Sequence, residues 1–344
     1  MGRRPFRLQP AATPFVNVFS GGRRGPPESG GFSGPQIEQI RRTVRRTPEV
    51  MVKVTGGGKT VGGVVAHLAY ISQQGELDLE TDEGQRVSKA EQKALVKDWH
   101  LELTAGQYRK PQKPDKRGRT IKLVHNVVLS MPAPTPPDKV LAAAKVFARE
   151  KFGAKHRYAM ALHTHQQHPH VHLVVKAEGI DGRRLHIDKA MLREWREDFA
   201  RMMRDQGIAA NATPRAVRGQ GKKGMPAAAY QSRRHGRSHS IRAQVESIAR
   251  ELTSTGAVRD PAHNKLAETR KAVVVGWRAI ADALDVQGEI VLAGEVRSFA
   301  TRLPPVLTDR ERLAAEFIRH VKAERSARTR GDEQARARTD ERTR

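Results

Sequence analysis

The stretch Tyr158–Lys176, with the sequence YAMALHTHQQHPHVHLVVK, decides the fold of this chain. Short apolar runs lie on both sides of Gln166-Gln167-His168-Pro169, and they predict two strands, residues 158–165 and 170–176, joined by a turn of four residues. Because such a pair is a β-hairpin, we expect the sheet around it to be mostly antiparallel.

This hairpin concentrates histidine: five of the chain's 14 histidines are His163, His165, His168, His170 and His172. Side chains alternate along a strand, so the two members of each His-x-His pair share one face. With a four-residue turn, His165 would lie opposite His170 and His163 opposite His172, with Cβ atoms roughly 5 Å apart. Three or four imidazoles would then converge on one patch.

Neutral imidazoles packed this closely favour a divalent cation, because protonating one ring would penalise the next. An all-histidine set suits Zn, Mn, Co or Ni better than Mg. The alternative is a group of half-exposed histidines on a polar sheet face. The facing His-x-His pairs favour the metal.

Outward from the hairpin, apolar periodicity predicts further strands and helices. Strands are expected at residues 50–54 and 121–131, and helices at residues 60–72, 88–103, 136–152 and 188–206. Ser88 with Glu91 three residues later marks the start of the second helix as a capping box. The order predicts an α+β fold with a central, mostly antiparallel sheet flanked by helices.

Composition divides the chain into five expected parts. They are a disordered basic arm at 1–49 with a short helix near 36–46, an ordered domain at 50–220, a basic linker at 221–243, a helical region at 244–320 that Pro304-Pro305 interrupts, and a charged C-terminal tail at 321–344, frayed or disordered.

The charge balance points to a polyanionic partner. Lys and Arg number 63 against 37 acids, for a net charge of +26, and nucleic acid is the commonest partner of such chains. The candidate DNA-binding residues come from the basic segments and the glycine turn: Lys59, Arg109, Lys110, Lys113, Lys116, Arg117, Arg119, Arg215 and Arg218.

Several classes of protein are excluded or disfavoured. The chain has no cysteine, so disulfides, thiolate catalysis and cysteine-based zinc sites are absent. It has no apolar run of about 18 residues and no signal-peptide pattern, so we expect no membrane insertion and a cytoplasmic location.

The turn Gly56-Gly57-Gly58-Lys59-Thr60 resembles a phosphate loop only superficially. A Walker motif needs glycine where this chain has Lys53, so nucleotide binding is discarded. The glycines either let the backbone approach a DNA phosphate or make a tight turn from strand to helix.

Tyr70 lies late in the first predicted helix. A tyrosine there is usually a packing residue. Beside a metal site in a basic protein, its phenol would suit attack on a phosphodiester, forming a phosphotyrosine that stores the bond energy for rejoining.

These motifs together resemble those of the conjugative relaxases, the mobilisation nucleases of the HUH class. The segment 163–172 resembles their histidine motif, 56–77 their nucleophile motif, 125–132 their middle motif, and 211–219 the end of their domain. The resemblance covers residues 50–220 and is nearest to the branch that includes the T-DNA border endonuclease of plant-transforming bacteria.

The resemblance implies a five-stranded antiparallel sheet, a divalent metal (Mn or Mg, with Zn as a further option) on His163, His170 and His172, and Tyr70 as the nucleophile at a nic site. It places His125 and His165 as candidate acceptors of the phenol proton. His165 stands where the family usually has Asp, and Lys176 where it often has Asn.

Further implications concern partners. They are single-stranded DNA at a transfer origin, relaxosome accessory proteins and the coupling protein of a type IV secretion system, to which the Arg-rich end of the chain would be a signal. The enzyme would act in the bacterial cytoplasm and travel to a recipient cell bound to DNA.

Two alternatives use the same residues differently. A rolling-circle replication initiator would normally carry its tyrosine after the histidine motif, whereas Tyr70 precedes it. A non-catalytic basic DNA-binding protein would use the histidines for a structural metal.

Overall fold

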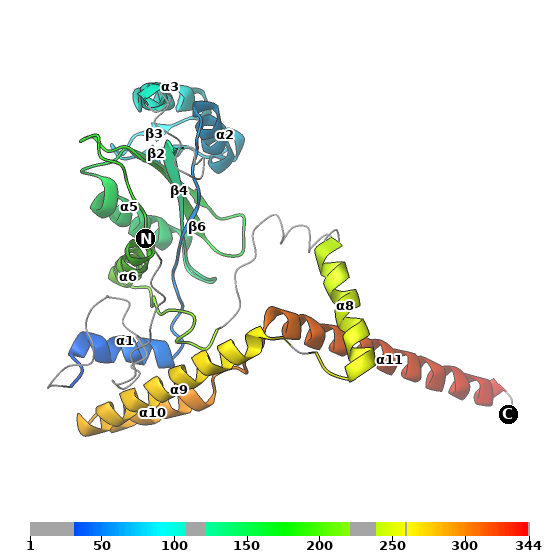
Figure 1. Cartoon of the computed structure of the whole chain (residues 1–344). Coiled ribbons are helices and arrows are strands. Elements are labelled where there is room, and N and C mark those ends of the chain that lie inside the picture. The colour runs from blue at the N-terminus through cyan, green and yellow to red at the C-terminus, as the bar shows by residue number, and fades with distance from the viewer. Residues whose placement is uncertain (1–30, 108–120, 221–238, 259, 343–344) are drawn as a thin grey trace, which may run out of the picture. The chain divides into compact units, whose positions relative to one another are not determined.

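The computed structural model describes residues 31–107, 121–220, 239–258 and 260–342. By their internal contacts the residues form two compact units, Asn17–Pro214 and a second one that contains Arg215–Arg344 (Figure 1). We call the first the sheet unit and the second the C-terminal unit, and each is described by itself.

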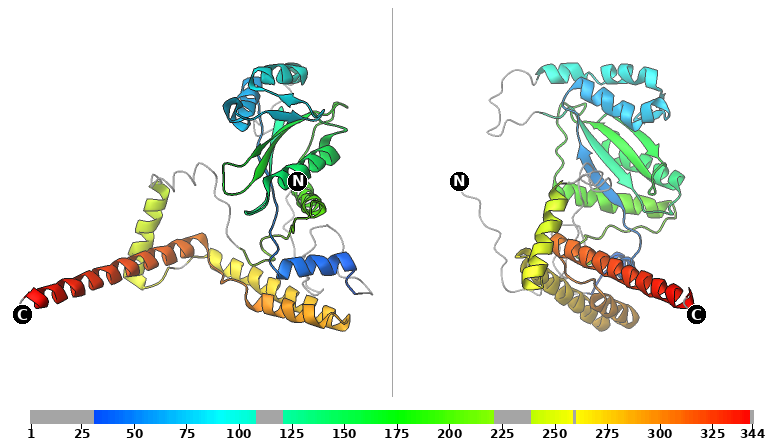
Figure 2. Two further views of the ribbon diagram at one scale, coloured as in Figure 1. Left: turned by 180° about the vertical axis from the view of Figure 1, so that it is seen from behind. Right: turned by 90° about the vertical axis from the view of Figure 1, so that its right-hand side faces the viewer.

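A six-stranded sheet with the order β1-β4-β6-β5-β2-β3 forms the centre of the sheet unit, and every neighbouring pair is antiparallel (Figure 2). The strands are β1 Met51–Gly56, β2 Leu79–Thr81, β3 Arg86–Val87, β4 Val124–Ser130, β5 Tyr158–His163 and β6 His170–Lys176. The α+β prediction is confirmed. The expected count of five strands is one too low, because the short hairpin β2–β3 extends the sheet beside β5.

Helices cover both faces of this sheet. On one face lie α5 Pro137–Phe152 and α6 Lys189–Asp205, whose Phe147, Trp195 and Phe199 pack edge to face over the strands. On the other lie α2 Val61–Ile71, α3 Gln92–Asp98 and α4 Leu101–Gln107. Each core buries aliphatic and aromatic surface, the main stabilising term in folding.

The helix predicted at 88–103 is interrupted. Its capping box is present, with the Ser88 backbone N–H and hydroxyl both donating to the Glu91 carboxylate at 2.9 and 2.7 Å, and it opens a 3-10 turn at Lys89–Glu91. The helix then divides into α3 and α4 at His100, whose φ of 50° is left-handed and cannot continue a right-handed helix.

The glycine turn before α2 is tightly packed. A Cβ at Gly57 would lie 2.3 Å from the Val124 carbonyl oxygen, and one at Gly58 would lie 2.5 Å from a Val64 methyl group. Of the two readings of this turn, the structure favours close packing between strand and helix.

The prediction of a disordered arm is wrong for residues 31–49, but the short helix expected near residues 36–46 is present as α1 Gly34–Val44. This helix begins at a capping box between Ser33 and Gln36, and Ile40 is completely buried. The buried Asn211 amide donates to Thr43, Glu49 and Thr213 at 3.3, 3.1 and 2.8 Å. These bonds, with a parallel bridge from Glu49 to Asn211, join the segment before β1 to the end of the sheet unit.

The C-terminal unit is helical, as expected. It contains α8 His239–Thr255, α9 Ala262–Val286, α10 Ile290–Thr301 and α11 Asp309–Arg342. Pro304-Pro305 lies between α10 and α11 as predicted, but α11 continues through residue 320, where a separate charged tail was expected to begin. None of the helices that the structure describes is both long enough and apolar enough to cross a membrane.

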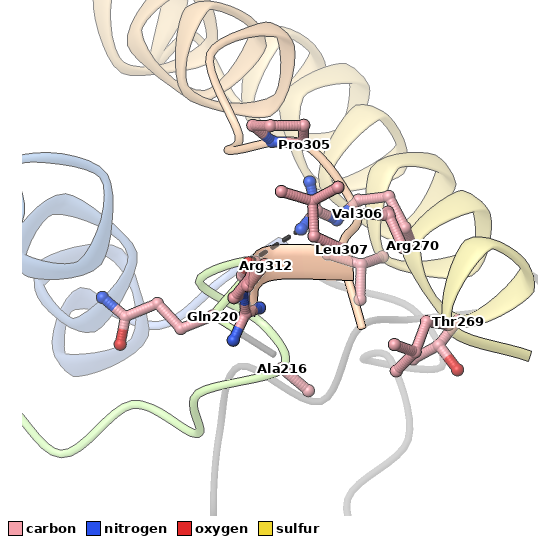
Figure 3. Close-up of a pocket in the computed structure, with 11 residues that line it drawn as sticks. Ala216, Gln220, Thr269, Arg270, Pro305, Val306, Leu307 and Arg312 are labelled. Carbon is pink, nitrogen blue, oxygen red and sulfur yellow. Dashed lines mark hydrogen bonds between the residues drawn. The ribbon is translucent and has the colours of Figure 1, made fainter. Parts of the chain in front are cut away.

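Residues 215–220 belong to this C-terminal unit, so the predicted domain boundary at 220 lies a few residues too late. The buried Trp277 donates to the Val217 carbonyl at 2.9 Å, and Arg270 donates to the Gly219 carbonyl at 2.7 Å. Arg270 also lines a small pocket with Leu307 and Arg312 (Figure 3). Most of the predicted basic linker, residues 221–238, lies outside the described residues.

Replacing Ile40 with alanine tests whether α1 belongs to the folded sheet unit. Removing a fully buried isoleucine side chain leaves a cavity, so Ile40→Ala should lower the free energy of unfolding by about 2–5 kcal/mol in chemical denaturation. Ile180→Ala is the control, because that side chain is 75% exposed and its loss should change stability by less than about 0.5 kcal/mol. Equal, small effects of the two substitutions would mean that α1 does not pack as described.

Candidate active site

Strands β5 and β6 carry the histidine cluster in a register that differs from the predicted one. His163 pairs with His170, and His172 pairs with Ala161. β5 ends at His163, so residues 164–169 connect the strands and the turn is longer than predicted. The observed pairing is therefore shifted by two residues from the predicted one. Because side chains alternate along a strand, an even shift leaves His163, His170 and His172 on their predicted face.

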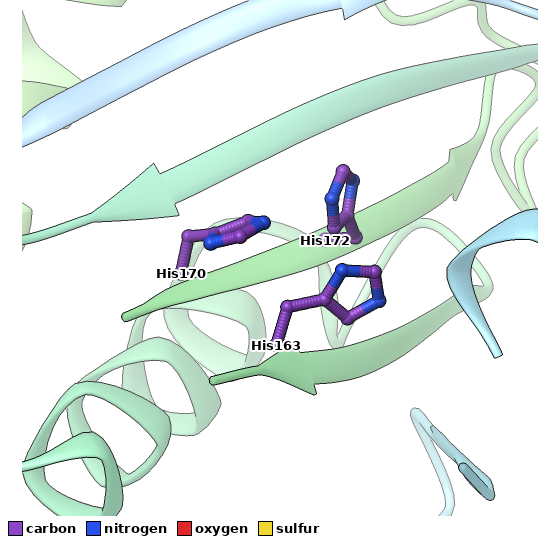
Figure 4. Close-up of side chains that lie close together, drawn as sticks. All are labelled: His163, His170 and His172. Atoms are coloured by element: carbon purple, nitrogen blue, oxygen red, sulfur yellow. The ribbon is translucent and has the colours of Figure 1, made fainter. Parts of the chain in front are cut away.

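Three rings converge on that face: His163, His170 and His172 (Figure 4). One ring nitrogen from each lies within 4.8 Å of those of the other two. The ring centroids of His163 and His172 are 4.5 Å apart, and the other two pairs are 5.1 and 5.0 Å apart. These three histidines could therefore hold one metal ion, as the family resemblance implies.

The surroundings keep these rings neutral. Burial is the main cause that lowers the pKa of His163 and of His170 below the ordinary range. Burial and then the neighbouring imidazoles lower the pKa of His172 to about 3. A neutral ring keeps a lone pair for a cation, so the donor set fits a divalent metal.

The nitrogens on the far side of two of the rings have partners. His163 donates from Nε2 to the Ile71 carbonyl at 2.6 Å, and His170 donates from Nδ1 to the His168 carbonyl at 3.0 Å. This leaves the lone pairs of His163 Nδ1 and His170 Nε2 free. Ligating histidines in metalloproteins are usually oriented in this way.

Tyr70 lies beside the cluster near the end of α2. The buried side of this helix consists of Val64, Leu68 and Ile71, so Tyr70 points away from the core and is 58% exposed. Its ring meets the His172 ring edge to face, with centroids 6.0 Å apart. The structure thus brings the predicted nucleophile and the predicted metal ligands together.

His165 lies at the margin of the cluster, exposed, with its ring centroid 5.1 Å from that of His163. It is not one of the three convergent histidines. The Gln73 amide donates to its Nδ1 at 2.8 Å, and a neutral ring that accepts there carries its proton on Nε2.

The prediction that His125 accepts the phenol proton is wrong. His125 pairs with Val175 on β6, whereas His172 pairs with Val128, and an odd separation along a strand puts the two histidines on opposite faces. His125 Nε2 donates to the Leu185 carbonyl at 3.2 Å, and no described group bonds its buried Nδ1. The sheet separates it from Tyr70.

The predicted DNA-binding residues fall into three groups. Lys59 is exposed in the turn before α2. Arg215 and Arg218 lie in the C-terminal unit. The other six, Arg109, Lys110, Lys113, Lys116, Arg117 and Arg119, lie outside the described residues.

Sequence reasoning missed three residues near the cluster. His67 stacks on Tyr70 with centroids 5.9 Å apart, and its spacing of three residues on one helix could have indicated this. Lys53 is exposed on the histidine face of β1, since it pairs with Val128, the partner of His172. No sequence pattern indicated Gln73, because its hydrogen bond to His165 depends on a left-handed backbone conformation at Gln73 itself.

Comparison with known proteins shows what this part of the chain is similar to. Residues 70–208 match the family model described as relaxase, MobA/VirD2-like, nuclease domain. The match includes Tyr70 and the three convergent histidines, and it confirms the resemblance seen in the sequence.

Three curated relatives are T-DNA border endonucleases VirD2. The chain is 28% identical to that of Rhizobium radiobacter over 191 residues, 25% to that of Agrobacterium fabrum over 214, and 27% to that of Rhizobium rhizogenes over 191. These alignments cover 50%, 56% and 50% of this chain. They cover 43%, 46% and 42% of the relatives, so the chain spans less than half the length of the proteins it matches.

The free energy of unfolding of the protein should depend on pH in a way that shows His125 to be buried in its neutral form. Burial and then the charge of Lys122 lower its pKa to about 4, below the value of about 6.5 for an unfolded chain. The unfolded state therefore binds the proton first, and stability that is present above pH ~6.5 is lost as the pH falls toward the folded pKa.

His125→Gln keeps a donor for Leu185 but does not titrate. In metal-free urea denaturation it should lose less free energy of unfolding than the wild type as the pH falls from about 7 to about 5. His186→Gln, at an exposed histidine of the neighbouring loop, should behave like the wild type. An unchanged pH dependence in His125→Gln would show that His125 does not resist protonation.

Proposed function

We propose that this protein is a metal-dependent relaxase that nicks one DNA strand at a transfer origin through a covalent tyrosine intermediate. The observation that carries the proposal is the position of the exposed Tyr70 ring against His172, at the edge of the three convergent histidines. The relaxase domain and the VirD2 relatives support it.

The reaction is a transesterification. The Tyr70 Oη attacks the scissile phosphorus and loses its proton, and the bond from phosphorus to the 3′ oxygen breaks. The leaving oxygen gains a proton, which gives a free 3′-hydroxyl and a 5′-phosphotyrosyl adduct, and the reverse reaction rejoins the strand.

His163, His170 and His172 would hold the divalent metal, Mn or Mg with Zn as a further option. When bound, the metal supplies positive charge that makes the scissile phosphate more electrophilic. The hydrogen bonds from His163 and His170 to backbone carbonyls fix these rings in place before DNA arrives.

The phenol proton can leave to solvent, because Tyr70 is 58% exposed, or to His165, the predicted acceptor that remains. Acceptance at His165 Nε2 requires the Gln73 amide to turn over, so that its Oε1 accepts a hydrogen bond from Nδ1–H instead.

The partners proposed with this activity are single-stranded DNA at the transfer origin, relaxosome accessory proteins and a type IV secretion coupling protein. Lys53 and Lys59 are exposed cations that could hold the DNA backbone, in line with the net charge of +26. The location proposed is the bacterial cytoplasm, followed by transfer to a recipient cell with the DNA.

Covalent adduct formation tests the nucleophile. Purified protein with labelled single-stranded origin DNA and Mn or Mg should give a labelled band that survives SDS and is lost with EDTA. Tyr70→Phe removes only the attacking oxygen and should abolish the band. The matched control is Tyr158→Phe, which removes the same oxygen from a tyrosine in the core between the sheet and α5 and α6. This variant should still form the labelled band.

Binding of DNA without an adduct, with every divalent metal and several origin segments, would refute the nuclease. A non-catalytic DNA-binding protein with a structural metal would then explain the site better.

Metal titration tests the histidine set. His172→Ala removes one of three donors, so the affinity for Mn in calorimetry should fall by at least the ~10- to 100-fold typical of disturbed metal sites. His125→Gln, on the other face of the sheet, should bind Mn as the wild type does. Equal affinities of the two variants would contradict this assignment.

A further inference from the structure

The chain takes an unusual path immediately after the helix that carries Tyr70. Gln73 and Gln74 have φ values of 50° and 60°, and Gly75 follows at 98°. Left-handed backbone is disfavoured for residues with a Cβ, and two such residues in succession are rare. This turn therefore needs a compensating contact.

Gln73 makes such a contact and Gln74 does not. The Gln73 amide donates to His165 Nδ1 at 2.8 Å, from the turn after α2 to the turn after β5. The Gln74 side chain is exposed, and no hydrogen bond joins it to the rest of the described chain. The left-handed backbone thus serves to direct one glutamine toward the histidine motif.

A second bond joins the same two segments. His163 donates to the Ile71 carbonyl at 2.6 Å, one residue after Tyr70. Ser72, between the two bonded residues, is completely buried and accepts a hydrogen bond from Gln92 at 2.9 Å. The end of α2 is thus held on both sides of Ser72 by the first two histidines of the motif.

We propose that Gln73 is a positioning residue for DNA cleavage: its bond to His165 holds the end of α2 so that Tyr70 presents its hydroxyl at the histidine cluster. This inference rests on the proposed function. The bond needs no charge, since a neutral imidazole can accept from a neutral amide.

Single-turnover adduct formation tests the proposal, with Gln74 as the matched control. Gln73→Ala should slow the chemical step by about 10- to 100-fold, because a small misplacement of a nucleophile has such an effect. Its affinity for DNA in EDTA should stay unchanged. Gln74→Ala, with the same backbone conformation, should react at the wild-type rate. Equal rates in the two variants would overturn the proposal.

A double-mutant cycle separates direct coupling from independent damage to the fold. Gln73→Ala removes the donor and His165→Ala removes the acceptor of the same bond, so the double variant should be no slower than the slower single variant. His165→Asp keeps an acceptor for the Gln73 amide and should be faster than His165→Ala. Losses of rate that multiply in the double variant would contradict a direct coupling of these positions.

Nitrogen NMR of the histidines provides a readout that does not depend on cleavage. In the metal-free wild type, His165 should show Nδ1 as the acceptor and the proton on Nε2, and Gln73→Ala should lose this preference while Gln74→Ala keeps it. The opposite tautomer in the wild type would overturn the proposal. Failure of the wild type to form any adduct would refute the proposed function, and the NMR result would still decide whether Gln73 holds His165.

Discussion

The hydrogen bond from His163 Nε2 to the Ile71 carbonyl joins the histidine face of the sheet to the end of α2. His163 is 2% exposed, so water does not compete effectively for this bond. The bond orients the ring and at the same time fixes the height of Tyr70 above the strands. One neutral imidazole therefore determines both the geometry of the histidine cluster and the position of the Tyr70 ring beside it.

Much of this site could be predicted, because alternation along a strand is a local property. The pattern His-x-His on two neighbouring strands requires convergence on one face, and a register error of two residues left that convergence intact. The length of the turn, in contrast, could not be predicted from neighbouring residues alone. Whether β5 ends at His163 or at His165 depends on contacts such as that between Gln73 and His165, which join residues far apart in the chain.

The orientation of His125 and the ordered packing of residues 31–49 show where sequence reasoning fails. The face to which His125 points depends on how β4 aligns with β6, and no short-range pattern contains that register. Residues 31–49 follow a Gly- and Pro-rich stretch and have the composition of a flexible arm. Their order is supported by Asn211, a buried amide whose hydrogen-bonding partners include Gln39 and Thr43 of α1 and also Glu49.

The bridge between Glu49 and Asn211 also bears on how such a protein can evolve. The strand that opens the sheet and the segment that closes the sheet unit lie side by side. A unit whose ends lie close together can be joined to different neighbouring sequences without disturbing its interior. The sheet unit is thus built so that the segments on either side of it can change while its core stays the same.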